Sequence, residues 1–195
     1  MPNPTDPRPL LTAALDQLDR QVAAFGPGEL SRPTPCDDFD VAKLLAHLTA
    51  VLRKLTLVRG GGDMTTVPDP AIDVAGHEAD ALRRARIDFE AAWLPADDAE
   101  LAADYTLAWG TMTGTELLDA YTHEFTAHAW DLAQAHGNAP DLDPALAEAA
   151  LDWFGSNVSP DGRGEGGPFG SPIPVADEAD AYTRLAGYLG RTSTG

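Results

Sequence analysis

The sequence predicts an all-α protein, an antiparallel four-helix bundle with a short C-terminal helical appendage. Four long segments place apolar residues at the three- and four-residue intervals of an amphipathic helix. Only one short segment has the β-branched and aromatic composition of a strand. Helix bundles commonly build metal and ligand sites from side chains on facing helices, so we expect any reactive site to lie there.

The first two helices are expected over residues 7–25 and 40–60, joined by a loop rich in Gly, Pro and Asp. The second helix starts after an Asp N-cap, at Asp38 or Asp40, and ends at a run of three glycines. It carries His47 within an apolar run. The apolar stripe of the first helix consists of Leu10, Leu11, Ala14, Leu15, Leu18, Val22 and Phe25.

A third helix is expected over residues 74–94, because the stripe of apolar residues stops before Pro95. Residues 103–114 are rich in β-branched and aromatic side chains and predict an extended, strand-like segment too short for a sheet of its own. The fourth helix is expected over residues 115–136, with Gly137 as its stop signal.

A shorter fifth helix is expected over residues 143–155. The Gly- and Pro-rich segment 156–175 follows, and its G-x-G-x-G spacing lacks the preceding strand and the Lys-Ser/Thr of a phosphate loop. A short helix over residues 177–190 closes the chain. We therefore expect a bundle domain over residues 7–155 and a C-terminal part, 156–195, packed on it.

Composition excludes several classes of function. The formal net charge is -18, from 31 acidic and 13 basic residues, which argues against binding nucleic acid or anionic membranes. A single cysteine allows no intramolecular disulfide. No secretory signal and no apolar run of about 20 residues is visible, so we expect a cytoplasmic protein.

Residues 121–137 place three histidines and a glutamate in the fourth predicted helix. A helix advances about 100° per residue, so Glu124 and His128, four positions apart, share one face. His123 and His128 are five positions apart and diverge. The segment is therefore not the H-E-x-x-H helix of zinc proteases, whose two histidines must be four apart.

A divalent metal normally takes at least three protein ligands, and His47 is the natural third beside Glu124 and His128. Such a His-Glu-His site with an open position is of the catalytic kind, able to lower the pKa of a bound water or thiol. The spacing alone equally allows a purely structural role, in which Glu124 and His128 form a helix-stabilising pair and His47 is a hydrogen-bonded histidine.

Three segments carry a resemblance to a known family: "TPCDDFDVAKLLAHL", "EFTAHAWDLAQAHG" and "GPFGSPIPVADEADAYTRLAGYLGR". They resemble the DinB-like superfamily and, within it, the actinobacterial metal-binding domain named after mycothiol-dependent maleylpyruvate isomerase. The resemblance runs from about residue 8 to residue 191. It implies a DinB-like four-helix bundle that holds a divalent metal, usually zinc or nickel, through His47, Glu124 and His128.

The resemblance also implies an activity. Family members commonly use a low-molecular-weight thiol such as mycothiol, which the metal binds and ionises for transfer or addition to a small electrophile. The expected partners are therefore a thiol and an electrophile, and a small bundle also fits a homodimer. The isomerases carry a C-terminal domain that we expect this chain to lack, so the maleylpyruvate reaction itself is not expected. The alternative is a non-catalytic metal- or ligand-binding module.

Several other residues near these motifs also have a structural and a functional interpretation. Asp131 either orients the ring of His128 or belongs to helix packing. Cys36, ahead of the second helix, is read as a small buried residue rather than a reactive thiol. The remaining histidines are expected to face solvent or to cap helix ends; they are His77, His123 and His136.

Segment 161–170 is either a lid or a surface loop. Long loops inside compact domains often close over sites. As a lid, the segment would cover the open side of the metal and supply Arg163 or Phe169 to a bound acid or thiol.

Overall fold

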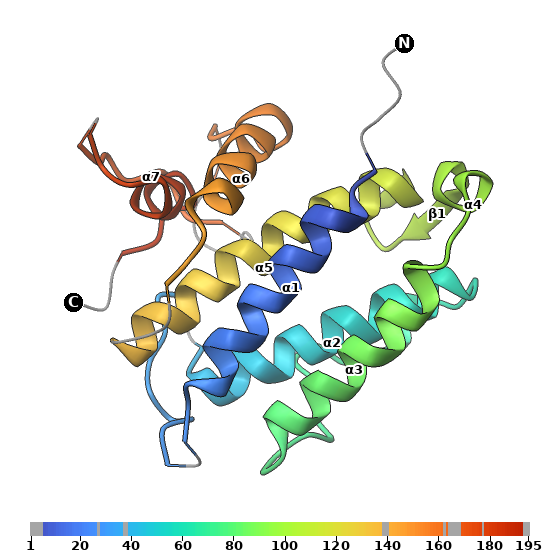
Figure 1. Ribbon diagram of the computed structural model, residues 1–195, viewed down its shortest axis with the longest axis horizontal. Helices are drawn as coiled ribbons and strands as arrows, with labels where there is room; N and C mark the ends of the chain where they lie inside the picture. The colour runs from blue at the N-terminus through green and yellow to red at the C-terminus, as the bar shows by residue number, and fades with distance from the viewer. Residues whose placement is uncertain are drawn as a thin grey trace.

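The computed structural model confirms an all-α architecture around a four-helix bundle (Figure 1). It describes residues 6–192 except 27, 37–38, 138–140, 162, 164–168 and 177. The bundle helices are α1 (Arg8–Ala23), α2 (Val41–Arg59), α3 (Glu78–Trp93) and α5 (Gly114–His136). The smaller elements are η1 (Met64–Thr66), α4 (Asp98–Ala102), β1 (Asp104–Leu107), β2 (Gly110–Thr113), α6 (Pro144–Asn157) and α7 (Ala181–Tyr188).

The bundle consists of two parallel helix pairs that run antiparallel to each other. Helix α1 lies along α5, and α2 lies along α3 (Figure 1). The indole N–H of Trp93, the last residue of α3, donates to the carbonyl of Leu55 near the end of α2, 3.1 Å away. Two parallel helices cannot be joined by a tight turn, so residues 60–77 return along α2 before α3 begins. This crossover segment positions part of the site described below.

The core lies between the four helices, where each fully buried Leu or Phe contributes about 1.5–3 kcal/mol. Its largest fully buried side chains include Leu11, Leu15, Leu44, Leu48, Phe89, Trp93 and Phe125. A second apolar cluster joins the outer face of α5 to α6 and α7 through Ala127, Trp130, Phe154, Tyr182 and Leu185. Helix α5 is therefore covered on both sides. The domain division at residue 155 stays a prediction.

Helix ends follow the expected capping chemistry. The Asp40 side chain accepts a hydrogen bond from the third residue of α2, whereas Asp38, the other predicted cap, lies outside the described residues. A reciprocal pair, Thr113 and Glu116, caps the start of α5. Gly137 adopts the left-handed conformation at φ 79° and ends α5, as predicted.

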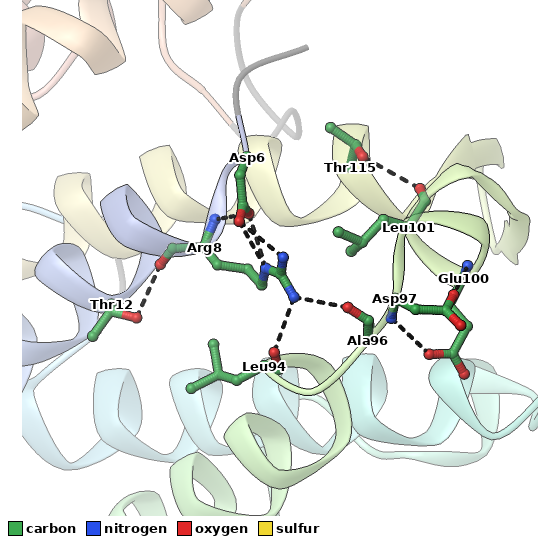
Figure 2. Close-up of polar contacts among 9 residues, drawn as sticks. All are labelled: Asp6, Arg8, Thr12, Leu94, Ala96, Asp97, Glu100, Leu101 and Thr115. Carbon is green, nitrogen blue, oxygen red and sulfur yellow. Dashed lines mark hydrogen bonds and ion pairs between the residues drawn. The ribbon is translucent and has the colours of Figure 1, made fainter. Parts of the chain in front are cut away.

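The start of α1 is tied to the connection after α3. The Arg8 guanidinium donates to the carbonyls of Leu94 and Ala96, at 3.0 and 2.7 Å, and also binds Asp6 (Figure 2). Asp97 then opens α4, a short helix that the sequence did not predict (Figure 2). These contacts anchor the end of the bundle from which α5 departs.

Segment 103–114 is extended as predicted, but the expectation that it is too short for a sheet of its own is wrong: it folds back on itself as a two-stranded antiparallel sheet, β1 with β2. Its turn carries Trp109, which is 63 % exposed. No helix within the described ranges is long and apolar enough to cross a membrane.

Candidate metal centre

The three predicted ligands come together in space. His47 lies on α2, and Glu124 and His128 lie on the same face of α5. One ligand atom of each residue lies within 4.8 Å of the other two. The Oε1 atom of Glu124 is 3.5 Å from Nε2 of His47 and 4.0 Å from Nε2 of His128. Metal binding by this cluster stays a prediction.

A carboxylate orients each imidazole. Nδ1 of His47 lies 2.7 Å from an oxygen of Asp69, and Nδ1 of His128 lies 2.8 Å from an oxygen of Asp131. With Nδ1 bound to a carboxylate, each ring presents Nε2 to Glu124. This is how metal-ligating histidines are usually held, with the carboxylate fixing the ring and raising its basicity.

Each of these carboxylates also contacts a cation through its second oxygen. The Lys54 ammonium lies 2.8 Å from the second oxygen of Asp69. The Arg191 guanidinium lies 3.0 Å from the second oxygen of Asp131, and it also contacts the Cys36 thiol. The structure thus places Asp131 where one of its two predicted roles requires it. Asp69, Lys54 and Arg191 were not predicted, because they reach the site from the crossover segment, from about two turns further along α2 and from beyond α7.

The two imidazoles differ in their pKa values. Burial lowers the pKa of His47, but hydrogen bonds with Asp69 and Glu124 outweigh it and raise the pKa to about 9. Burial also lowers the pKa of His128, and there the bond to Asp131 does not compensate. For Glu124, burial raises the pKa, but the hydrogen bond with His47 prevails and holds it below the ordinary value. Near neutral pH, Glu124 is therefore ionised and His128 is neutral.

The donor set fits a divalent ion. Two imidazole nitrogens and one carboxylate oxygen suit zinc and are accepted by nickel. Both Nε2 atoms face the same carboxylate, and both Nδ1 atoms are already occupied. A second group, Cys36 with His128 and Asp131, also has its ligand atoms within 4.8 Å. There, however, the imidazole and the carboxylate are bonded to each other, which makes the first set the better site.

A cavity of about 450 Å³ adjoins the cluster. His47 and Glu124 lie in its wall, together with side chains from α2, α5, α6, the hairpin and the crossover segment. Most of the wall is apolar, including Val51, Met64, Met112, Trp153 and Phe154. A reactive group at the His47–Glu124 side would therefore face a largely apolar space.

Segment 161–170 was predicted to be either a lid over the site or a surface loop, and the described residues bear on this choice. Phe169 lines the cavity, as the lid reading expects. Arg163 does not; its guanidinium donates to the backbone carbonyls of Val158, Ser159 and Tyr188. Residues 162 and 164–168 lie outside the described part of the chain.

One expectation about the other histidines is wrong. His123 is only 2 % exposed, and its ring packs against Trp153 at a centroid distance of 5.4 Å. Helical spacing assigned His123 to the face of α5 away from the bundle, but α6 covers that face. His77 is exposed at the N-cap of α3, and His136 packs edge-on against Phe25 near the end of α5.

Cys36 is half-buried rather than fully buried, beside His128 and Asp131. Trp130 packs in the second apolar cluster between α5 and the C-terminal helices.

Comparisons with known proteins agree with this architecture. Residues 11–133 match the family model described as the mycothiol maleylpyruvate isomerase N-terminal domain. Two proteins from two strains of Mycobacterium tuberculosis, both described as uncharacterised, are each 30 % identical over 190 residues, covering 96 % of this chain and 98 % of theirs.

Two solved structures share the fold. The crystal structure of the mycothiol-dependent maleylpyruvate isomerase matches with a TM-score of 0.63 and 16 % identity, over 99 % of this chain and 91 % of that chain. A mutant of that isomerase matches with a TM-score of 0.57 and 13 % identity, over 80 % and 73 %. The predicted lack of the isomerases' C-terminal domain stays a prediction.

Proposed function

Since the chain belongs to the family of the mycothiol maleylpyruvate isomerase N-terminal domain, we propose that it is a metal-dependent enzyme that joins a low-molecular-weight thiol to a small electrophile. His47, Glu124 and His128 would hold one divalent ion, zinc or nickel. The observation that carries the proposal is the convergence of these three side chains beside an apolar cavity, with His47 and Glu124 in its wall. The thiol would be mycothiol or a close analogue.

When bound, the ion would supply a Lewis acid that binds the thiol sulfur and lowers its pKa, so that the nucleophilic thiolate forms near neutral pH. The chain itself provides orientation. Asp69 and Asp131 hold the two rings so that both Nε2 atoms face Glu124. His128 is neutral near pH 7, and the proton on Nε2 of His47 must leave when the ring becomes a ligand.

The cavity wall has a separate role. Its apolar side chains would exclude water from the space in front of His47 and Glu124 once a substrate fills the cavity. Exclusion of water strengthens electrostatic interactions at the reacting atoms and protects a thiolate from competing proton donors. The cytoplasmic location and the homodimer stay predictions.

Thiol turnover tests the proposal. The zinc- or nickel-loaded protein is incubated with mycothiol and a panel of α,β-unsaturated carbonyl and alkyl halide electrophiles, and free thiol is followed with a disulfide dye. We expect thiol loss above the uncatalysed rate with the loaded wild type, and none with the chelated protein or with Glu124→Ala. Metal binding without thiol consumption across the panel would instead indicate a metal-binding module and contradict the proposed enzymatic activity.

A further inference from the structure

The cavity has little positive charge available for an anionic ligand. Lys54 is the one basic side chain among its described lining residues, apart from the imidazole of His47. The Lys54 ammonium is already paired with Asp69 at 2.8 Å, and the other oxygen of Asp69 binds His47. In the metal-free protein His47 is in turn paired with Glu124. Each cation in the wall thus has its own carboxylate.

The neighbouring loop adds no free cation. Arg163 is close in sequence to Phe169, which lines the cavity, but its guanidinium is taken up by backbone carbonyls. The intervening residues 164–168 contain no Lys or Arg. Across the whole protein, a net charge of -18 further disfavours the approach of anions.

The lining of the cavity suits an apolar ligand. Three aromatic side chains from the C-terminal half, Trp153, Phe154 and Phe169, line the cavity together with Trp109 from the tip of the hairpin. The cavity volume of about 450 Å³ lies in the usual range for small-molecule sites, roughly 300–1,000 Å³. Trp109 is 63 % exposed although it is a large apolar residue, which suits a contact made when a ligand fills the cavity.

We propose that this cavity takes an uncharged, largely apolar molecule, and that this molecule is the electrophile. The identification of this molecule as the electrophile rests on the proposed function. With a divalent ion in place, Glu124 and one thiolate neutralise the ion, and Asp69 neutralises Lys54. A carboxylate on the second substrate would then lose its hydration without gaining a partner. Neutral aromatic or aliphatic carbonyl compounds fit; dicarboxylates do not.

A matched pair of probes tests the charge preference. 2-Acetylnaphthalene and 2-naphthoate have nearly the same shape, and the second carries a negative charge. Binding of each to the full-length protein is measured by isothermal titration calorimetry, with and without bound zinc. We expect the ketone to bind at least about tenfold more tightly than the carboxylate in both forms, because only the carboxylate has a charge to desolvate. Equal or tighter binding of 2-naphthoate overturns the inference.

Three variants locate the binding. Met112→Lys places a cation in the wall and is expected to improve binding of 2-naphthoate relative to the ketone. Trp109→Ala changes an exposed residue, leaves the fold intact and should weaken binding of the ketone several-fold. Ile87→Ala removes an exposed apolar side chain on α3, away from the cavity, and should change nothing. Unchanged ketone binding in Trp109→Ala, or an equal loss in Ile87→Ala, places the ligand elsewhere and overturns the inference.

Metal content measured on the same samples separates the two proposals. If the protein prefers the ketone but never holds a metal, the apolar ligand site stands and the proposed function falls, along with the assignment of the ligand as electrophile. If the protein holds a metal but prefers 2-naphthoate, the proposed function stands and the present inference falls.

Discussion

Two groups of three side chains flank Glu124, and each runs from an imidazole through a carboxylate to a cation. We call them the edge triad (His47, Asp69 and Lys54) and the buried triad (His128, Asp131 and Arg191). The side chains of the edge triad are 18, 26 and 17 % exposed, and those of the buried triad are 7, 0 and 9 % exposed. The pKa of the edge imidazole is raised to about 9, whereas the pKa of the buried imidazole is lowered. The same hydrogen-bond pattern therefore gives opposite protonation, because burial and the nearby Glu124 act differently on the two rings.

The largest loss of stability is expected when the cation of the buried triad is removed. Arg191→Met leaves the fully buried Asp131 without its cation, with the His128 ring as the remaining contact, which should lower the free energy of unfolding by about 3–5 kcal/mol. Urea denaturation measures the change. Arg184→Met is the matched control, because Arg184 pairs with Glu148 on the surface and should contribute at most about 1 kcal/mol. Similar small losses in both variants would mean that Asp131 does not need its cation.

The carboxylates should matter for metal affinity in both triads. Asp69→Asn and Asp131→Asn each remove the charge that orients a ligating ring, which should weaken metal binding by about 10–100-fold. Competition with a chromophoric chelator measures the affinity. Asp73→Asn is the control, since Asp73 lies in the same crossover segment but pairs with Arg53. If Asp69→Asn binds metal as tightly as the wild type, the edge triad has no role in holding the ring.

The two imidazoles should titrate apart in the metal-free protein. NMR of the ring nitrogens is expected to give a pKa of about 9 for His47 and a value below 6.5 for His128. Because the folded-state pKa of His47 is raised, its stabilising contribution is complete below pH 6.5 and is lost as the pH rises through about 9. The free energy of unfolding in urea should therefore be higher for the chelated wild type than for chelated His47→Gln at pH 6.5, and this difference should shrink as the pH rises to about 9. Equal pKa values for the two rings would contradict the comparison.

The smallest effect is expected at the cation of the edge triad. Lys54→Met removes the partner of a carboxylate that is 26 % exposed, so water can replace the ammonium. The free energy of unfolding should fall by about 0–1 kcal/mol. A loss as large as that of Arg191→Met would show that the edge triad is as dependent on its cation as the buried one.

Local sequence signals predicted the four bundle helices, the two C-terminal helices and one part of the site, but not the short helix α4. The four-residue spacing of Glu124 and His128 placed them on one face of α5, and the apolar run around His47 pointed its ring inward. The parallel course of α2 and α3 was not predicted, because periodicity within a helix carries no information about its direction. Asp69 and Arg191 could not be predicted either, since tertiary packing alone brings them to the rings. His123 was misassigned for the same reason: the sequence does not say which face α6 covers.

Metal content tests the central claim most directly. Wild type, Glu124→Ala/His128→Ala and the control His136→Ala, which changes a histidine on the same helix outside the cluster, are purified untagged and analysed for metal per chain. We predict about one divalent ion per chain in the wild type and in the control, and none in the double variant, because three ligands are the usual minimum for such a site. A wild type that stays metal-free after addition of zinc or nickel would contradict the account and leave the cluster a structural one.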